Sequence, residues 1–218
     1  HPIVDIVKPS MTVNEANAFA GKKEGRKLIL LMPGSRLMEI EKMLPTLLEA
    51  AKIIQKQLPE VDFVMPRAGT IPLNLLEEKI QASGLDVRIT EGHNYDLFSV
   101  ADLALATSGT VTLEAALCGL GSVIVYRTNP LTYMIAKLVV NIPHIGLPNI
   151  VAGRSVVPEL IQNDFTPAKV AKAAMELLES ERNALMKKDL EYVKERLGKP
   201  GAVGRVAELV LKIAGEKR

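Results

Sequence analysis

The sequence predicts an α/β fold: a Rossmann-like parallel sheet with helices on both faces, followed by a helical C-terminal region. Short apolar runs alternate with longer segments of helical spacing through the first 126 residues. That order makes βαβ units, which require a parallel sheet. From residue 127 onward the apolar segments have the length or the spacing of helices, so no further strand is predicted. Because 48% of the 218 residues are hydrophobic, the chain can bury a sizeable core.

Five apolar runs of strand length mark the sheet, and helical spacing with Pro and Gly at the ends marks the helices between them. Apolar residues keep helical spacing from Leu37 to Leu58. Pro45 lies inside that pattern and predicts a short first turn, a break, and a main helix from about residue 45. The predicted strands are residues 27–32, 61–65, 86–90, 103–106 and 123–126, and the other predicted helices are residues 72–82, 95–100, 131–140, 156–162, 167–178, 180–197 and 202–214.

Charge and cysteine content exclude several classes of function. The 27 Lys and Arg and the 25 Asp and Glu are interspersed, without the clustered basic excess of a nucleic-acid-binding protein. The single cysteine, Cys118, excludes an internal disulfide and a metal site of several thiolates, and it fits a reducing, intracellular setting. No apolar run reaches the roughly 18–20 residues of a transmembrane helix, and no signal peptide is visible at the start. We expect neither a metal nor a cofactor.

The loop after the first predicted strand, Met32-Pro33-Gly34-Ser35-Arg36, lies where ligands bind to an open parallel sheet, beyond the carboxyl ends of the strands. Gly34 permits a ligand to approach the backbone closely. Ser35 can cap the helix that follows, and Glu39 is near a capping-box position. Arg36 offers a forked donor suited to phosphate. On these residues alone, a capped helix start with a solvent-facing Arg36 is an equally good interpretation.

The loop after the fourth predicted strand ends an apolar run at Thr107. Ser108, Gly109 and Thr110 then begin a helix, whose exposed N–H groups and positive dipole end can bind phosphate. Glu114, one turn further on, would repel phosphate but can accept two hydrogen bonds from a ribose diol. The stretch therefore predicts a site for a nucleoside diphosphate. The alternatives are a simple helix cap at Ser108 and a solvated carboxylate at Glu114.

Four segments, in this order and spacing, resemble the C-terminal half of the lipid-A-disaccharide synthase family, bacterial glycosyltransferases of the two-domain GT-B architecture. They are LMPGSRLMEIEKMLP, DLALATSGTVTLEAAL, VIVYRTNPLTYMIAKLVV and IGLPNIVAGRSVVPELIQ, of which the last two are the most specific. The resemblance covers nearly the whole chain. His1-Pro2 resembles the family's Gly-His-Pro at the crossover between domains. We therefore expect a piece of a longer protein, without the N-terminal acceptor domain.

This resemblance implies the domain organisation and the reaction. Residues 1–218 would form a single UDP-sugar-binding domain, with a βα core at 1–126, a helical region covering the site at 127–201 and a terminal helix at 202–218. The family transfers 2,3-diacylglucosamine from UDP to 2,3-diacylglucosamine 1-phosphate, giving the β-1,6-linked lipid A disaccharide and UDP. It uses no metal, so cations and helix dipoles must stabilise the departing diphosphate, a role implied for Arg36. The general base is expected in the N-terminal domain, so this fragment would bind nucleotide without turnover.

The resemblance also implies further substrate-binding residues. The segment from Leu147 to Gln162 would fold over the diphosphate, with Asn149 donating to a phosphate oxygen or to the donor sugar. The remaining candidates are Arg127, Arg154, Glu159 and Gln162. The alternatives are that Asn149 only closes a turn, that Arg154 and Glu159 pair with each other on the surface, and that Gln162 is solvated.

The acylated substrates imply partners and a location: UDP, UDP-diacylglucosamine, the lipid monosaccharide phosphate, and the cytoplasmic face of the bacterial inner membrane, to which the enzyme would be peripheral. Residues 131–140, LTYMIAKLVV, are interpreted first as a buried helix and alternatively as an interfacial segment. The helix at 202–214 docks on its own sheet, extends freely, or pairs with a second chain. An apolar face left by the other domain would favour a homodimer. We expect no nucleic-acid partner.

Two other functions stay open. A sugar-nucleotide epimerase of the same fold would need acid–base carboxylates or histidines close to the sugar carbon, and the segments after Tyr126 do not fit that need. His93 and His144 are interpreted as loop residues. A non-catalytic nucleotide-binding module is the third alternative.

Overall fold

Six parallel strands form one sheet in the computed structural model, which describes residues 1–129 and 143–215. The strand order is β3-β2-β1-β4-β5-β6, and every neighbouring pair is parallel. The predicted Rossmann-like α/β fold is thus confirmed. The strands are β1 (Lys27–Met32), β2 (Val61–Arg67), β3 (Val87–Glu91), β4 (Leu103–Thr107), β5 (Ser122–Tyr126) and β6 (Glu159–Ile161).

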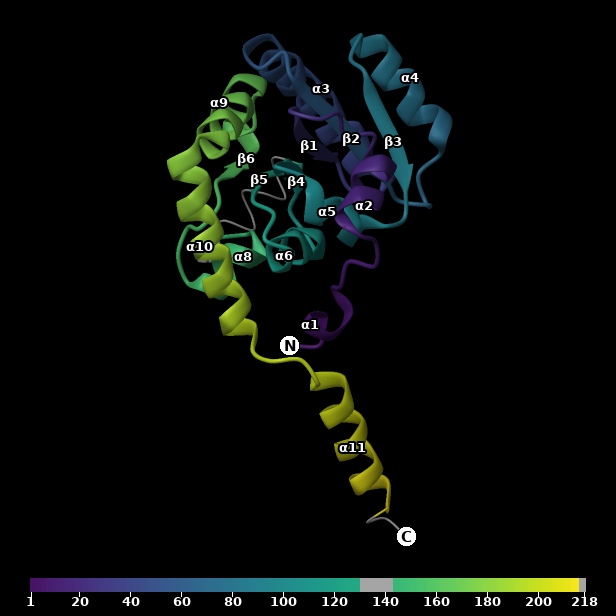
Figure 1. Ribbon diagram of the computed structural model, residues 1–218, viewed down its shortest axis with the longest axis vertical. Coiled ribbons are helices and arrows are strands. Elements are labelled where there is room, and N and C mark those ends of the chain that lie inside the picture. Colours follow the sequence, from purple (N-terminus) through teal and green to yellow (C-terminus); the bar gives the residue numbers. More distant parts are fainter. Residues whose placement is uncertain (130–142, 216–218) are drawn as a thin grey trace.

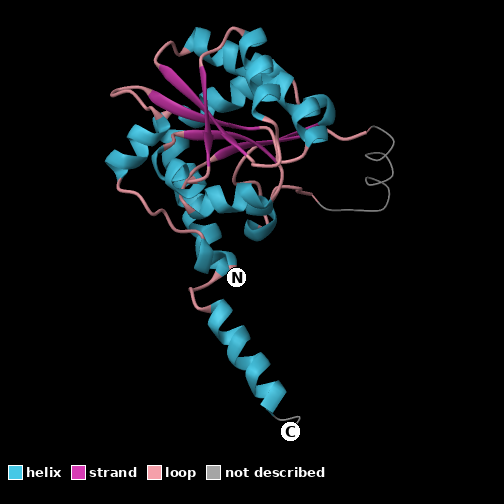
Figure 2. Cartoon of the chain, turned by 90° about the vertical axis from the view of Figure 1, so that its right-hand side faces the viewer, coloured by secondary structure: helices cyan, strands magenta, loops and turns pink. Residues whose placement is uncertain are grey.

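Helices cover both faces of the sheet (Figure 2). Alternate residues of a strand face opposite sides, so Ile29 and Leu31 of β1 pack into the core under α3, α4 and α9, and Leu28 and Leu30 pack into the core under α2 and α5. The helices are α1 (Ile3–Ile6), α2 (Val13–Ala20), α3 (Leu37–Gln57), α4 (Leu73–Ser83), α5 (Asn94–Val100), α6 (Thr110–Leu117), α8 (Leu147–Ala152), α9 (Pro167–Leu178), α10 (Ser180–Leu197) and α11 (Ala202–Gly215), with a 3-10 turn at Gln162–Asp164.

The helix α3 is continuous through Pro45, so the predicted break there is wrong. A proline inside a helix removes one backbone hydrogen bond and costs about 3 kcal/mol. Eight side chains of α3 are buried, some before Pro45 and some after it, and the Ile, Leu and Met among them each contribute about 1.5–3 kcal/mol when fully buried. Burial of the whole apolar face therefore outweighs the local cost.

The segment 156–162 forms strand β6 and the start of a 3-10 turn, so the predicted helix is wrong, as is the prediction that strands end at Tyr126. Pro158 explains the error, because a proline disfavours helical conformation in the residue before it. The carbonyl of Pro158 accepts the Ile124 amide at 2.9 Å and starts the pairing of β6 with β5. Helix α8 was not predicted, and the predicted helix at 131–140 lies outside the described residues.

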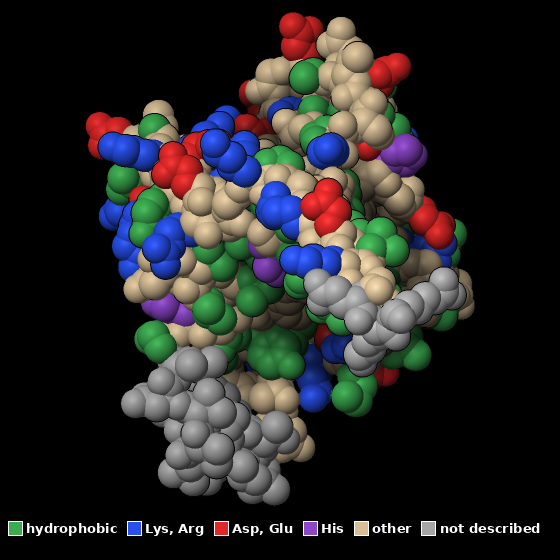
Figure 3. Space-filling view, turned by 90° about the horizontal axis from the view of Figure 1, so that it is seen from below, with side chains coloured by type: hydrophobic (Ala, Val, Ile, Leu, Met, Phe, Trp, Pro, Cys, Tyr) green, Lys and Arg blue, Asp and Glu red, His purple; other side chains and the backbone are tan. Residues whose placement is uncertain are grey.

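The terminal helix α11 extends away from the body of the molecule (Figure 1), and none of its residues is buried. The Asp5 carboxylate of α1 accepts the Gly201 amide and, at 3.0 Å, the Val203 amide. These bonds fix the start of α11 to the N-terminal turn and leave its apolar side chains exposed. Seen from below, basic and acidic side chains are intermixed with hydrophobic ones over this end of the molecule (Figure 3).

Candidate functional site

A cavity of about 440 Å³ opens at the carboxyl ends of β1, β2 and β4. The strand order places β4 on the other side of β1 from β2, so the loops that follow β1 and β4 diverge to opposite faces and leave a crevice between them. This is the position at which doubly wound sheets bind ligands. The polar and glycine residues of the cavity lining are Gly34, Ser35, Arg36, Glu39, Arg67, Asn94, Thr107, Ser108, Gly109, Thr110 and Glu114.

The loop after β1 is held by Glu39. Its Oε2 accepts the backbone amides of Ser35 at 2.8 Å and Arg36 at 3.2 Å, and its Oε1 lies 3.1 Å from Nη1 of Arg36. The helix cap is therefore Arg36 with Glu39, and the expected capping role of Ser35 is wrong. Gly34 has a φ of 118°, and a Cβ there would lie 2.4 Å from Oε2 of Glu39. Glycine is needed so that Glu39 can fold back over the loop.

The Arg36 guanidinium is the most accessible cation of the cavity, because 81% of its side-chain surface is exposed. Its one partner among the described residues is Glu39. A guanidinium in that position can reach a ligand in the cavity without breaking a buried contact.

The loop after β4 places the N-terminus of α6 in the same cavity. Gly109 precedes the helix in extended conformation, and Thr110 begins it. The first amides of a helix lack intrahelical partners and carry the positive end of its dipole. Ser108 is fixed from two sides, because its amide donates to Val125 at 3.0 Å and its Oγ donates to the carbonyl of Ile145 at 3.1 Å.

Glu114 lines the cavity one turn into α6. Burial raises the pKa of this carboxyl. In the described part of the chain it has no hydrogen bond or ion pair, so both oxygens are available to a ligand. The charge of Glu114 also adds to burial in raising the pKa of Tyr95. Arg36, the tip of α6 and Glu114 thus meet in one cavity.

Asn149 and Glu159 lie outside the cavity lining and bond to their own chain. Asn149 is buried, and its Oδ1 accepts the amides of Val156 at 2.7 Å and Val157 at 3.0 Å. Its Nδ2 donates to the Val157 carbonyl at 2.8 Å and to Glu159 Oε1 at 2.6 Å. Asn149 therefore closes the turn between α8 and β6.

Glu159 in turn accepts the amides of Ile145 at 2.9 Å and Gly146 at 3.1 Å. The carbonyl of Ile145 is the acceptor of the Ser108 hydroxyl. Through this chain of bonds, Glu159 positions the loop after β4 without entering the cavity.

The other three candidates also lie away from the cavity lining. Arg154 pairs with Asp189 at 2.6 Å and lies over the ring of Tyr192, so it does not pair with Glu159. Arg127 donates to the carbonyl of Phe165 and lies 4.8 Å above that ring.

Gln162 has a φ of 54°, unusual for a residue other than glycine, and its Oε1 accepts the Thr128 amide at 3.3 Å. Its buried Nε2 has no hydrogen-bond partner among the described residues. This amide is therefore free to bond a group outside the described chain.

Four polar residues of the cavity lining were not predicted as site residues from the sequence: Glu39, Arg67, Asn94 and Thr107. Arg67 was missed because β2 extends two residues beyond the predicted strand. Thr107 is 3% exposed, and its hydroxyl has no partner among the described residues. The sequence signal that could have identified Thr107 was a hydroxyl residue at the last position of a fully buried strand.

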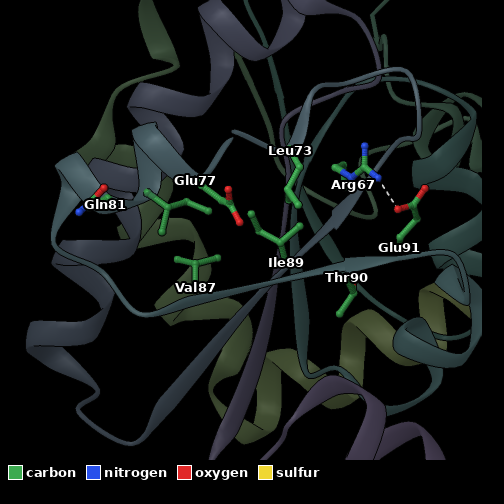
Figure 4. Close-up of a pocket in the computed structure, with 9 residues that line it drawn as sticks. Arg67, Leu73, Glu77, Gln81, Val87, Ile89, Thr90 and Glu91 are labelled. Atoms are coloured by element: carbon green, nitrogen blue, oxygen red, sulfur yellow. Dashed lines mark hydrogen bonds and ion pairs between the residues drawn. The ribbon is translucent and has the colours of Figure 1, made fainter. Parts of the chain in front are cut away.

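A larger and more open hollow of about 700 Å³ lies at the outer edge of the sheet, between α4 and β3. Figure 4 shows its side chains, with Arg67 directed at Glu91 and the apolar Leu73 and Ile89 in the middle. The other charged residue of its lining is the carboxylate Glu77. Because its one cation is already paired, this hollow suits an anionic ligand less well than the smaller cavity does.

A sequence profile of the family described as "Lipid-A-disaccharide synthetase" matches residues 1–213. The chain belongs to this family. Lipid-A-disaccharide synthases of two bacteria illustrate the relationship. The Geobacter sulfurreducens protein is 41% identical over 218 residues, covering 100% of this chain and 57% of that protein. The Trichlorobacter lovleyi protein is 42% identical over 212 residues, covering 97% and 55%. This lipid-A-disaccharide synthetase family member thus spans somewhat more than half the length of its relatives.

Solved structures with low sequence identity to the chain share its fold. A UDP-GlcNAc 2-epimerase from Neisseria meningitidis bound to UDP-GlcNAc has a TM-score of 0.59 at 18% identity, covering 92% of this chain and 47% of that one. Anabaena Alr3699/HepE in complex with UDP-glucose has a TM-score of 0.60 at 15% identity, covering 88% and 50%. WaaG, a glycosyltransferase involved in lipopolysaccharide biosynthesis, has a TM-score of 0.59 at 18% identity, covering 89% and 50%.

Residues 1–129 and 143–215 contain no group of three or more His, Cys, Asp or Glu arranged to hold a metal ion. Within the same ranges of this lipid-A-disaccharide synthetase family member, no helix has the length and apolar character to cross a membrane.

Proposed function

We propose that residues 1–218 form the UDP-sugar-binding domain of a lipid-A-disaccharide synthase. The observation that carries the proposal is the convergence of Arg36, the N-terminus of α6 and Glu114 on one cavity at the switch point of the sheet. Family membership supports it, as do the nucleotide sugars bound in the Neisseria and Anabaena structures.

In this proposal the nucleoside-proximal phosphate lies at the tip of α6, near Ser108, Gly109 and Thr110. Glu114 follows on the same helix and accepts the ribose hydroxyls, which lie next to that phosphate in the ligand. The distal phosphate then extends toward Arg36 across the cavity. Gly34 and Ser35 supply the backbone at this end.

The reaction proposed is transfer of 2,3-diacylglucosamine from UDP to 2,3-diacylglucosamine 1-phosphate. The 6-hydroxyl of the acceptor attacks C1 of the donor sugar, and the bond from C1 to the diphosphate oxygen breaks. The acceptor proton goes to a general base in a preceding domain, and UDP leaves. Arg36 and the α6 dipole stabilise the charge that develops on the diphosphate, without a metal. The 218-residue chain binds nucleotide but does not turn over.

Among the remaining candidates, Gln162 lies away from the cavity lining, so we propose it as a contact only for a part of the donor that extends beyond the cavity; its buried amide lacks a partner in the described residues. Asn149 and Glu159 act on the substrate indirectly, by fixing the loop that receives the Ser108 hydroxyl. Arg127 and Arg154 are engaged by their own chain, and we leave them out of the proposed site.

An epimerase would need acid–base groups free to reach the sugar carbon. The carboxylates that line the cavity are Glu39, which is bonded to backbone amides, and Glu114. Neither His93 nor His144 lines it. These residues favour the transferase over the epimerase.

Acylated substrates also place the enzyme at a membrane, and we propose that it is peripheral to the cytoplasmic face of the inner membrane. Co-sedimentation with anionic liposomes checks this, and a chain that stays in the supernatant contradicts it.

The exposed apolar side chains of α11 are proposed to pack against a second chain or the preceding domain. A sedimentation mass that stays monomeric at high concentration excludes the homodimer.

Calorimetric titration of UDP into the wild-type chain tests the proposal, with UMP and CDP as comparison ligands. Saturable binding of UDP, weaker binding of UMP and no turnover of UDP-diacylglucosamine are expected. A chain that binds none of these nucleotides is not the donor-binding domain proposed here.

A further inference from the structure

The charges that line the 440 Å³ cavity do not suit a diphosphate as they stand. Two guanidiniums, Arg36 and Arg67, face two carboxylates, Glu39 and Glu114. Arg67 is already paired with Glu91 and donates to the carbonyl of Ile71 at 2.7 Å. Among the described residues of the lining, the cation left for a ligand is Arg36, and its partner is Glu39. A diphosphate that enters this cavity therefore finds the Arg36 guanidinium, the group best placed to bind it, already paired with the Glu39 carboxylate.

Glu39 holds three donors at once. One oxygen accepts the amides of Ser35 and Arg36, and the other lies 3.1 Å from the Arg36 guanidinium. Two successive amides at a helix N-terminus with an adjacent guanidinium form a donor set that suits a phosphate group as well as a carboxylate. Gly34 has no side chain, which gives the Glu39 carboxylate room to reach this position.

We propose that Glu39 competes with the distal phosphate of the nucleotide for the donors at the start of α3, an inference that rests on the proposed function. Diphosphate binding displaces the carboxylate from Ser35 and Arg36. Glu39 thereby lowers the affinity for UDP selectively, and it assists release of UDP after transfer. A nucleoside monophosphate, whose phosphate lies at the tip of α6, is affected less.

A helix-capping role alone gives a different expectation. A capping glutamate stays on the amides when ligand binds, and glutamine replaces it with little effect because its side-chain oxygen can accept the same bonds. Competition for the site depends on the negative charge, which glutamine lacks. The Glu39→Gln variant therefore separates the two roles while it preserves the helix start.

The experiment is calorimetric titration of UDP and UMP into the wild-type chain, Glu39→Gln and Glu41→Gln. Glu41 is an exposed carboxylate of the same helix, outside the cavity, so its variant makes the same change in net charge. In Glu39→Gln we expect UDP binding to tighten about three- to tenfold, the effect of removing one like charge at a partly solvated site. We expect less than about a twofold change for UMP, and no change for either ligand in Glu41→Gln.

Thermal unfolding shows whether Glu39→Gln is folded. Unchanged or weaker UDP binding by the folded variant overturns the proposal, while UDP binding by the wild type keeps the proposed function in place. Tighter binding of UDP and UMP by the same factor also overturns it. If neither chain binds UDP, both proposals fall.

A structure of the wild-type chain with UDP gives a second test that does not depend on the variant. The expected result is a phosphate oxygen bonded to the Ser35 and Arg36 amides, with Glu39 moved away. A Glu39 carboxylate still bonded to both amides overturns the proposal.

Discussion

The Nδ2 of Asn149 donates to Oε1 of Glu159 at 2.6 Å, and this pair joins helix α8 to strand β6. The same carboxylate accepts the amides of Ile145 and Gly146, so the turn, the edge strand and the preceding loop share one acceptor. Buried polar groups that are satisfied in this way cost free energy when one partner is removed.

Replacing Asn149 with Ala should reduce the free energy of unfolding by about 2–4 kcal/mol, because it leaves the amides of Val156 and Val157 without an acceptor in a buried turn and removes one donor each from the Val157 carbonyl and the Glu159 carboxylate. Urea unfolding followed by circular dichroism measures the change. Asn183→Ala is the control, because that side chain makes a single bond, to Leu177, in a more exposed place. Equal and small losses for both variants would show that the Asn149 network does not stabilise the fold.

Pro45→Ala should stabilise the chain by about 1–3 kcal/mol, since Pro45 is exposed inside α3 and alanine restores a helical hydrogen bond. The midpoint of urea unfolding reports the gain. A loss of stability would mean that the proline is required by the packing of α3.

Glu114→Gln should raise the melting temperature at pH 7 by about 1–3 °C and weaken UDP binding in the same experiment series. Burial raises the pKa of Glu114 in the fold above its ordinary value of 4.5. The ionised form is therefore disfavoured in the folded state, and the penalty grows as the pH rises through the raised pKa. The gain in the variant should disappear below about pH 4.5. A gain that persists in acid would point to a cause other than the charge.

Cys118 should react very slowly with thiol reagents in the folded chain. Burial, helped by the charge of Glu114, raises the pKa of its thiol to about 12. At pH 8 the thiolate fraction is then about a thousandfold lower than for an ordinary cysteine. The rate of reaction with Ellman's reagent, measured with and without urea, checks this. Rapid modification before unfolding would show that the helix α6 is loosely packed.

The sheet and its first five strands followed from the sequence because each is a short run rich in apolar or β-branched residues and bounded by turn residues. The short edge strand β6 could not, because Glu159–Ile161 holds three residues and its pairing with β5 comes from tertiary contact. Likewise, nothing local shows that α3 continues through Pro45, since the compensating burial depends on the strands beneath it.

The same division holds for the site. Gly34, Arg36, Ser108 and Glu114 could be found because parallel strands bring the loops after their carboxyl ends to one edge. Asn149 and Glu159 also carry polar side chains, but these bond to each other, and the spacing along the sequence does not reveal that. Arg67 enters the cavity only because β2 is longer than its apolar run.

Titration of UDP into wild type, Arg36→Ala, Glu114→Ala and Arg154→Ala tests the central claim most directly. The first two variants should each weaken binding by about 1–3 kcal/mol, the cost of a lost charge-assisted hydrogen bond. Arg154→Ala should bind as the wild type does, because this arginine pairs with Asp189 outside the cavity. UDP affinities that are the same in the Arg36 and Glu114 variants as in the wild type would contradict the account.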